Sequence, residues 1–413
     1  MPDVPSVLSK WSMVLAIAAC CSATAAEAEV RLVRTGPTVR VEVDGELFAA
    51  VQTAERQRKP YLYPVMQPGW SQQPWRAGHY VVVHDATMQL ERDGSKVEWA
   101  ARLPAGQKIT VDRRDSGRLH VLAPAAGWID ETAAVPARHL AVRLMESDPL
   151  PYDRKHPAYY EHPHHRGIWI AIDEVGETGF WHEAGKIDAV SVDLLDEAGE
   201  TATLRLVTRW FAEGDETDDQ PDAPLAAFGP VVLRQATLFT FHDDGLIDTV
   251  STFRPPQDET ATFGDTKEGL LGVRMPTDRR EKSRGLIRSA NGAIGEEDAW
   301  GRVADWVDYI GPAPDRDDEA TAESALPGIS LFNHPSNARP SRYHVRSYGL
   351  FSINPFGPNA YSRGAAPADP LTLAGDESIT LRYGVWVHGE AGQEAVRTRY
   401  ARYAAKARYA AKD

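Results

Sequence analysis

The sequence has 413 residues and a formal net charge of −14, because 59 acidic side chains outnumber 45 basic ones. Hydrophobic residues make up 42% and charged residues 25%, the balance of a folded globular protein rather than a disordered or fibrous one. The acidic excess argues against nucleic acid or an anionic membrane surface as the main partner.

The cysteine content narrows the chemistry further. Only Cys20 and Cys21 are present, and both lie in a segment that we interpret as an export signal. A chain processed after Ala26 therefore contains no thiol, which excludes disulfides, cysteine-ligated zinc, iron–sulfur clusters and a cysteine nucleophile. Any catalysis must then use histidine, carboxylate, lysine, arginine, tyrosine or hydroxyl groups.

Residues 1–26 have the layout of a secretory signal peptide. A short apolar run at residues 11–19 follows Lys10, and small side chains continue to Ala26. Neither this run nor any other reaches the ~18 apolar residues that a transmembrane segment needs. In the alternative, the signal ends at residue 19, because residues 17–20 resemble a lipobox with Cys20 as a lipid anchor. We therefore expect an exported protein, periplasmic or extracellular, and in the second case lipid-anchored to the envelope.

Short β-like runs follow one another along the rest of the chain. Two hairpins are indicated where such runs flank the turns Asp44-Gly45 and Asp243-Asp244-Gly245. The predicted strands are residues 39–43, 47–51, 80–83, 97–103, 108–111, 119–122, 190–194, 202–210, 231–241, 247–253, 329–332, 350–353 and 379–387. Frequent strands with few helical periods predict an all-β fold, a large β-sandwich over residues 27–390.

The last stretch, residues 391–413, is rich in alanine and in basic residues and predicts a C-terminal helix. A basic helix can bind a membrane or a partner protein, but docking on the acidic surface of the same chain is the simpler expectation.

Five of the thirteen histidines lie between His156 and His182. The densest block, residues 162–166, leads into an alternating strand-like segment at residues 167–173. With a period of two, the isoleucines at 168, 170 and 172 face the core, so Trp169 and Asp173 share the other face. That face predicts the floor of a polar, aromatic-lined cleft of the kind that receives a sugar ring.

Imidazole near a carboxylate suits acid–base catalysis at neutral pH, and two imidazoles with a carboxylate can hold a divalent metal. The candidate catalytic histidines are His164, His165 and His182. The candidate metal ligands are His162, His164 and Glu183. The candidate substrate-binding side chains are Arg166, Trp169, Asp173 and Trp181. The alternative is a hydrogen-bonded, purely structural histidine cluster at the start of a strand.

Two further motifs carry polar groups at predicted strand ends. Residues 263–269 (FGDTKEG) suggest a cleft rim, with Glu268 as a candidate base and Lys267 as a hydrogen-bond donor. A solvated turn is the alternative there. Asn333 and His334 follow the predicted strand 329–332, where the amide could bind a substrate hydroxyl or cap a turn and the imidazole could join the catalytic groups.

Several blocks together resemble a family of exported bacterial proteins labelled "methane oxygenase PmoA-like", largely of unknown function. The blocks are residues 59–69, 161–173, 263–274, 299–312, 333–340, 348–357 and 381–389. The resemblance implies an all-β sandwich similar to the galactose-mutarotase supersandwich. If that similarity holds, it implies a histidine acid with Glu268 as base, and Arg166 and Asp173 as groups that hold hydroxyls. It implies no established reaction.

The chain departs from this family pattern in one respect. In the family the first block lies close before the HPHHRG block, whereas here residues near 70–155 separate them and predict an extra β-rich insert. The family label also suggests membrane-bound methane oxidation. We reject that activity, because the sequence after the signal has no long apolar span.

We therefore expect a protein that acts on a carbohydrate or another small polar substrate. The first hypothesis is a sugar epimerase or mutarotase, or a glycoside lyase or hydrolase, with no cofactor beyond a possible divalent metal. The alternatives are a carbohydrate-binding module that holds a glycan without turning it over, and a structural envelope protein whose histidines would be scattered.

Overall fold

The computed structural model describes residues 28–92, 95–144, 162–214, 223–313, 316 and 319–406. The predicted signal segment with Cys20, the first histidine of the predicted cluster, His156, and residues 407–413 of the predicted helix lie outside these ranges. Among the described residues, none of the helices has the length and apolar character to cross a membrane.

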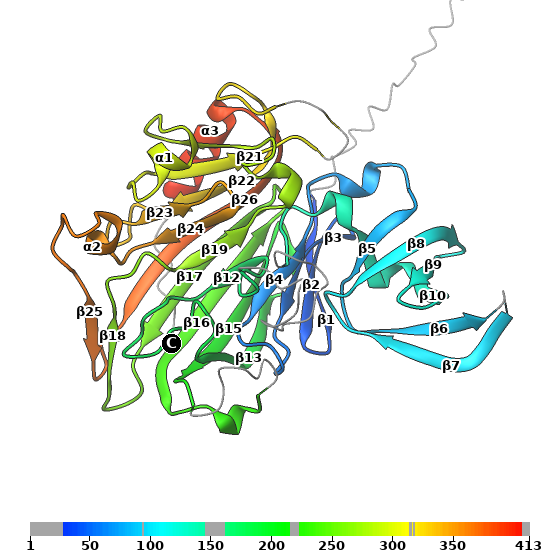
Figure 1. Cartoon of the computed structure of the whole chain (residues 1–413), viewed down its shortest axis with the longest axis horizontal. Helices are drawn as coiled ribbons and strands as arrows, with labels where there is room; N and C mark the ends of the chain where they lie inside the picture. The colour runs from blue at the N-terminus through cyan, green and yellow to red at the C-terminus, as the bar shows by residue number, and fades with distance from the viewer. Residues whose placement is uncertain are drawn as a thin grey trace, which may run out of the picture.

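Two large antiparallel sheets form the body of the protein (Figure 1). The first has nine strands in the spatial order β14-β1-β2-β3-β4-β12-β19-β24-β23. Its strands are β1 (Val30–Thr35), β2 (Thr38–Val43), β3 (Glu46–Gln52), β4 (Tyr61–Val65), β12 (Ile168–Ile170), β14 (Ala198–Gly199), β19 (Leu271–Arg274), β23 (Arg342–Val345) and β24 (Leu350–Asn354).

The second sheet has eight strands in the order β13-β15-β16-β17-β26-β22-β21-β20. Its strands are β13 (Lys186–Asp196), β15 (Thr201–Phe211), β16 (Val231–His242), β17 (Leu246–Arg254), β20 (Leu286–Ser289), β21 (Trp306–Ile310), β22 (Leu326–Asn333) and β26 (Ile379–Ala391). A separate pair, β18 (Thr260–Phe263) and β25 (Leu371–Ala374), flanks it.

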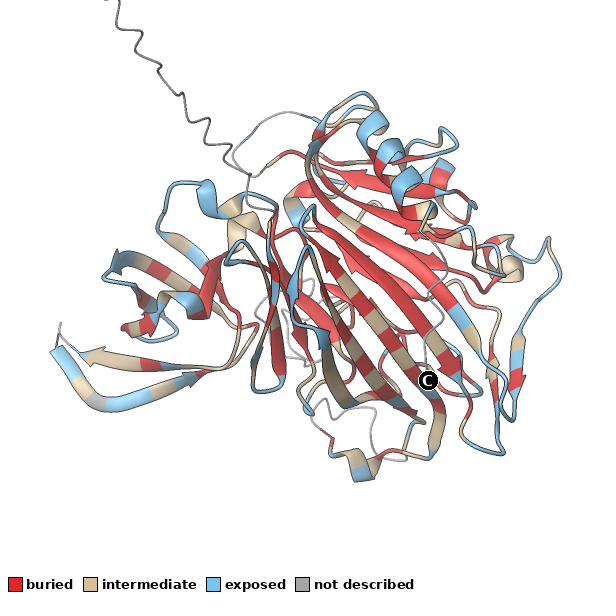
Figure 2. Cartoon of the chain, turned by 180° about the vertical axis from the view of Figure 1, so that it is seen from behind, coloured by how far each residue is buried: buried red, intermediate tan, exposed pale blue. Residues whose placement is uncertain are grey.

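The two large sheets share one hydrophobic core. Ile168 and Ile170 of the first sheet and Leu206 and Phe239 of the second line the same interior void of about 20 Å³. Buried and less buried residues alternate along β16, so one face of the second sheet packs inward and the other faces outward (Figure 2). The predicted all-β fold is confirmed.

A third sheet of seven strands projects from the side of this body (Figure 1). Its order is β11-β5-β8-β9-β10-β6-β7, and it has its own hydrophobic cluster. Its strands are β5 (Gly78–Val82), β6 (Ala86–Arg92), β7 (Ser95–Leu103), β8 (Lys108–Asp115), β9 (Arg118–Ala123), β10 (Gly127–Asp130) and β11 (Ala134–Pro136). Because β4 and β12 pair directly, the chain leaves the nine-stranded sheet and returns beside the strand that it left, as an inserted unit does.

Helices are few. The α-helices are α1 (Gly295–Ala299), α2 (Pro358–Tyr361) and α3 (Gln393–Ala404). The 3₁₀ helices are η1 (Trp70–Gln72), η2 (Glu131–Ala133), η3 (Ala137–His139), η4 (Leu225–Ala227) and η5 (Thr277–Arg279). Helix α3, which the sequence predicted, packs on the second sheet through buried Val396 and Tyr403, and its Arg399 pairs with Asp244.

The sharpest local constraint lies where β12 begins. Gly167 has φ +57°, and a Cβ built there would lie 2.1 Å from the carbonyl oxygen of Leu62 on β4. Only glycine therefore allows β12 to pair with β4 at this point. This residue immediately follows the block of histidines.

We expect Gly167→Ala to destabilise the protein by about 3 kcal/mol or more, because it combines an unfavourable φ with a backbone clash. The matched control is Gly36→Ala, since Gly36 has φ +59° and open space around the added Cβ. That control should cost only about 1 kcal/mol. Urea denaturation of both variants measures the difference, and equal losses would contradict the close approach.

Candidate functional site

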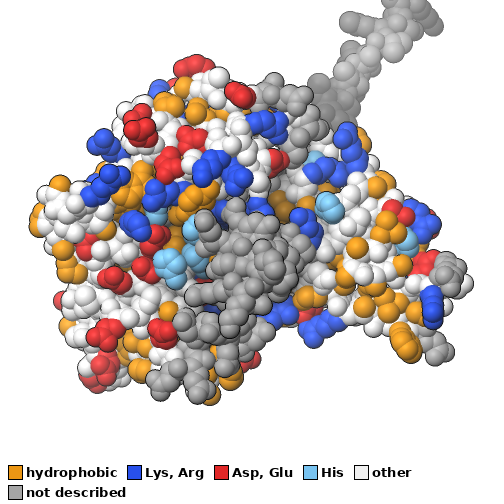
Figure 3. Space-filling model, viewed as in Figure 1, with side chains coloured by type: hydrophobic (Ala, Val, Ile, Leu, Met, Phe, Trp, Pro, Cys, Tyr) orange, Lys and Arg blue, Asp and Glu red, His pale blue; other side chains and the backbone are white. Residues whose placement is uncertain are grey.

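The described histidines of the predicted cluster lie together on the outer side of β12. The rings of Tyr348, His162, His165 and Trp169 form a stack, with successive centroids 4.8, 4.7 and 5.3 Å apart. His164 lies edge-on to His165 at 4.4 Å. Exposed histidine side chains are visible near the middle of the face shown in Figure 3, among basic and acidic side chains.

Two of these imidazoles are buried and hold nitrogens without a hydrogen-bond partner. The atoms are Nε2 of His164 and Nδ1 of His165, whose residues are 6% and 1% exposed. Burial, and after it the positive groups nearby, hold the pKa of both imidazoles well below the usual value. Both are therefore neutral at neutral pH, with lone pairs available to a ligand.

The alternation along residues 167–173 predicted an open cleft floor lined by aromatic side chains, and this prediction is wrong. Trp169 and Trp181 are 1% and 0% exposed, and they pack against each other with ring centroids 5.1 Å apart. Strand β12 lies inside the nine-stranded sheet and is covered on both faces, so a period of two does not mark an open side. The two tryptophans support the histidines and do not offer a stacking surface.

Glu183 was expected to join a metal site, but its carboxylate is engaged elsewhere. Lys59 Nζ donates to its Oε1 at 2.8 Å, and Arg166 Nη2 donates to its Oε2 at 3.2 Å. Burial alone would raise the pKa of Glu183, but Arg166 and Lys59 outweigh burial and lower it. Arg166 also binds Gln57, so its guanidinium is a structural group rather than the hydroxyl-binding group that we expected.

His182 and Asp173 form an accessible pair beside this buried cluster. Oδ1 of Asp173 lies 2.8 Å from Nδ1 of His182, whose side chain is 49% exposed. Asp173 can only accept, so Nδ1 carries the hydrogen and Nε2 is left for a substrate. The His182 ring lies 4.7 Å from that of His164, which connects the pair to the cluster.

Glu268 lies beside this pair, on the neighbouring segment. The backbone N–H of Asp173 donates to the Glu268 carbonyl at 2.9 Å, and Lys267 Nζ donates to Glu268 Oε1 at 2.7 Å. Burial would raise the pKa of Glu268, but His344 and Lys267 outweigh burial and hold it below the usual range. Glu268 also counters part of the fall in the pKa of His165, so its charge reaches the cluster.

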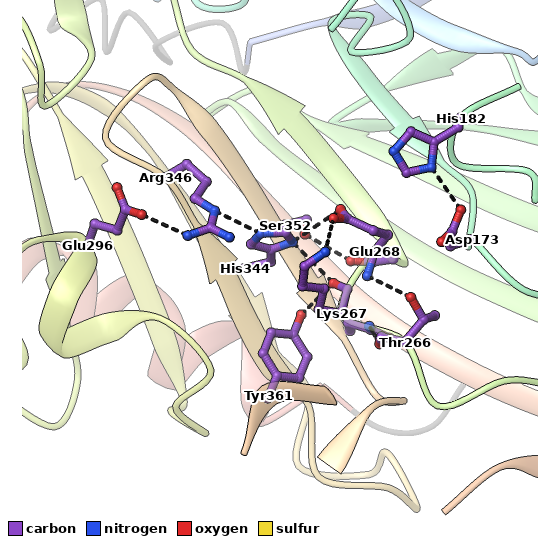
Figure 4. Close-up of polar contacts among 12 residues, drawn as sticks. Asp173, His182, Thr266, Lys267, Glu268, Glu296, His344, Arg346, Ser352 and Tyr361 are labelled. Carbon is purple, nitrogen blue, oxygen red and sulfur yellow. Dashed lines mark hydrogen bonds and ion pairs between the residues drawn. The ribbon is translucent and has the colours of Figure 1, made fainter. Parts of the chain in front are cut away.

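A chain of polar groups continues from Glu268 to the other side of the site (Figure 4). His344 Nδ1 lies 3.4 Å from Glu268 Oε2 and 3.1 Å from the Lys267 carbonyl oxygen. Arg346 Nε donates to His344 Nε2 at 3.1 Å and its Nη1 donates to Glu296 at 2.9 Å. These bonds assign the hydrogen of His344 to Nδ1. An open cavity of about 640 Å³ adjoins Arg346 and Glu296.

Sequence reasoning missed His344 and Arg346. They lie two residues apart on the short strand β23 and its end, so both reach the same side of the sheet. The H-x-R spacing within a strand was the available signal. That spacing did not indicate that His344 would contact Glu268, which is distant in sequence.

His334 and Asn333 do not join the site. His334 is buried against Ser336, Arg382 and the ring of Tyr403 on the eight-stranded sheet. The side-chain oxygen of Asn333 accepts from Asn337 at 2.9 Å. Both residues organise the loop after β22 beneath helix α3.

The residues that could hold a metal are His162, His164 and His165. One nitrogen from each ring can be chosen so that all three lie within 4.8 Å of one another. His164 and His165 supply neutral imidazoles with buried nitrogens that lack a hydrogen-bond partner, and imidazole is a ligand that a borderline metal such as zinc accepts. The chemistry of this donor set therefore fits a divalent cation.

We expect Lys59→Met to destabilise the protein by about 3 kcal/mol, because it leaves Glu183 buried with only one cationic partner. The control is Lys267→Met, which removes a partly exposed lysine from Glu268 and leaves His344 beside that carboxylate, so it should cost less than about 1 kcal/mol. Chemical denaturation compares the two variants. Similar losses would show that the buried pair does not hold this region together.

Comparison with known proteins gives a family without an assigned activity. The model of a family described as "Family of unknown function (DUF6807)" matches residues 144–402, more than half of the chain. The matched segment begins after the seven-stranded sheet and includes the histidine cluster and Glu268. Comparison with curated proteins finds no match.

Several solved structures are weakly similar to this one. A GH36 α-galactosidase from Geobacillus stearothermophilus is 14% identical over 78% of this chain and 41% of its own, with a TM-score of 0.31. A galactose 1-epimerase from Lactobacillus acidophilus is 10% identical over 77% of this chain and 100% of its own, with a TM-score of 0.29. An aldose epimerase homologue from C. elegans is 9% identical over 88% and 99%, with a TM-score of 0.24. This chain spans about two fifths of the galactosidase, and TM-scores this low carry no argument about activity.

Proposed function

This chain belongs to the DUF6807 family of unknown function, and we propose that it is an enzyme that acts on a sugar or a glycoside by acid–base chemistry. The observation that carries the proposal is the pair of His182 and Asp173, which presents one free imidazole nitrogen at the surface. The backbone of Asp173 is hydrogen-bonded to that of Glu268, whose ionised carboxylate points toward Lys267 and His344 (Figure 4). We also propose that the protein works outside the cytoplasm, as the signal-like segment indicates.

In this proposal His182 moves the proton. Asp173 holds the imidazole in the tautomer with Nε2 unprotonated and stabilises the imidazolium that forms when Nε2 accepts a proton. His182 then returns the proton to the ring oxygen, which opens the ring for anomer exchange, or to a leaving oxygen, which completes bond cleavage. Imidazole suits both steps because it gains and loses protons near neutral pH.

Glu268 has a different role in the proposal from the base that we first expected. A carboxylate with a lowered pKa is a weak base, and both of its oxygens already have partners. It remains negative, so it can accept hydroxyl hydrogen bonds and stabilise positive charge that develops on a sugar. Lys267, which is partly exposed beside it, can donate to another hydroxyl.

We further propose that His162, His164 and His165 hold a divalent cation in this site. Support comes from the two buried nitrogens without partners, because a buried polar atom that binds nothing destabilises the folded state. A cation here would supply Lewis-acid polarisation of a substrate oxygen near His182. Glu268 would then balance part of the added charge.

The alternatives fit these residues less well. A binding module would use Trp169 and Trp181 as stacking surfaces, and both are buried. A structural envelope protein would scatter its histidines, whereas four of the five in the predicted window lie within one contact network.

The test is an NMR survey of aldoses, oligosaccharides and uronides that separates anomer exchange, epimerisation at other carbons and bond cleavage. For the substrate found, we expect His182→Asn to lower kcat/KM by about 10²–10⁴-fold and Asp173→Asn to lower it strongly as well. The matched control is His120→Asn, because His120 also pairs with an aspartate, Asp112, but in the seven-stranded sheet. Full activity of His182→Asn would refute the role of this pair.

We expect purified protein to bind zinc or a similar cation stoichiometrically, and His164→Ala and His165→Ala to lose it. His334→Ala is the control, since that buried histidine lies outside the cluster. Metal analysis gives the content. Added cation should also raise the melting temperature of the wild type but not of His164→Ala, by the usual linkage of binding to stability. No metal and no shift in the wild type would remove the cation from the proposal.

A further inference from the structure

We propose that the outward face of the eight-stranded sheet binds an acidic polysaccharide through a row of arginines. In the strand register Arg209 of β15 lies opposite Arg234 of β16, which lies opposite Arg254 of β17. All three are exposed. Directly opposite residues project from the same face with Cβ atoms ~5 Å apart, so the three guanidinium groups form one row across three strands.

Such a row opposes folding, because like charges placed opposite each other repel. The same face uses neutral pairs elsewhere, where Thr203 meets Thr240 through their hydroxyls. An acid tempers one end of the row, because Asp188 lies opposite Arg209. Arg234 is placed between two arginines. An anionic ligand would relieve this repulsion.

The row borders a groove large enough for an oligomer. The groove has a volume of about 1170 Å³, and its lining includes Arg205, Arg234, Arg254 and Arg382 against two acidic residues, Asp258 and Asp376, so basic groups outnumber acidic ones. This exceeds the ~300–1,000 Å³ of ordinary small-molecule pockets. Guanidinium groups bind carboxylates or sulfates in a bidentate manner, and the exposed hydroxyl of Ser378 in the same lining can bind a sugar hydroxyl.

The groove lies on the opposite side of the sandwich from the histidines. Leu206 and Phe239 face the interior void that Ile168 also lines. Val207 and Leu238, each one residue away, line the groove, so its floor faces outward. The groove is therefore a second site, and this inference does not depend on the chemistry proposed for His182.

A polysaccharide fits better than other polyanions. The net charge of −14 repels a long phosphate backbone or an anionic membrane once it extends beyond the groove. A polysaccharide also carries hydroxyl groups on each unit, which can bind the exposed polar side chains beside the arginines, whereas a phosphate backbone or a membrane surface presents few of them.

The test measures binding of the full chain by calorimetry at low and physiological salt. The probes are an oligogalacturonide, a sulfated oligosaccharide of equal length, a neutral oligosaccharide, single-stranded DNA of equal charge and anionic phospholipid vesicles. We expect one acidic oligosaccharide to bind with marked salt dependence. Arg234→Gln should weaken binding at least tenfold, and Arg209→Gln/Arg234→Gln further. The carboxylate and sulfate arms identify the acidic group.

Two controls separate this site from the histidine site and from general charge effects. Arg31→Gln removes another exposed arginine, on β1, and should leave binding unchanged, as should His182→Asn. Melting temperatures establish that the arginine variants remain folded. Equal binding of the neutral oligosaccharide, preference for DNA or vesicles, no binding of either acidic probe, or no effect of Arg234→Gln would each overturn the proposal.

Discussion

The candidate site depends on one buried carboxylate held between two cations. Glu183 pairs with Lys59, just before β4, and with Arg166, at the start of β12. Three segments distant in sequence are therefore fixed to one point. The histidines at 162–165 precede Arg166 and His182 precedes Glu183, so the same ion triad determines where both groups of imidazoles lie. A buried carboxylate stays ionised only when its cationic partners are held in good hydrogen-bonding geometry, and removing one partner leaves part of its charge uncompensated.

Around this triad the protein maintains two electrostatic environments within one site. Burial keeps His164 and His165 neutral, whereas Lys267 and His344 keep Glu268 ionised although it too is largely buried. The pKa is lowered in all three residues, which leaves the two imidazoles neutral and the carboxylate charged. Strongly shifted pKa values of grouped side chains are characteristic of sites that transfer protons or hold cations. A purely structural cluster would gain nothing from leaving imidazole nitrogens without partners.

Local turn chemistry made much of the fold predictable, whereas the site was only partly predictable. The Asp44-Gly45 turn joins β2 and β3 as expected, with positive φ at both residues. Alternation misplaced Trp169, because β12 is a short central strand covered on both faces and sequence does not reveal sheet order. His182 and Glu268 could be singled out from composition and motif. Their link through His344 and Arg346 required the pairing of β23 with β24, which is a long-range property.

The inserted seven-stranded sheet has a consequence for how the chain can fold. Its first and last strands, β5 and β11, are hydrogen-bonded neighbours, and Met66 and Leu140 form a bridge just outside them. Once this unit has formed, its two ends are already close together. The flexible chain that must be closed when β4 pairs with β12 is then much shorter, so the entropy cost of this pairing is smaller. The inserted sheet therefore keeps the two ends of the chain that leave and re-enter the nine-stranded sheet close together, which favours the pairing of β4 with β12.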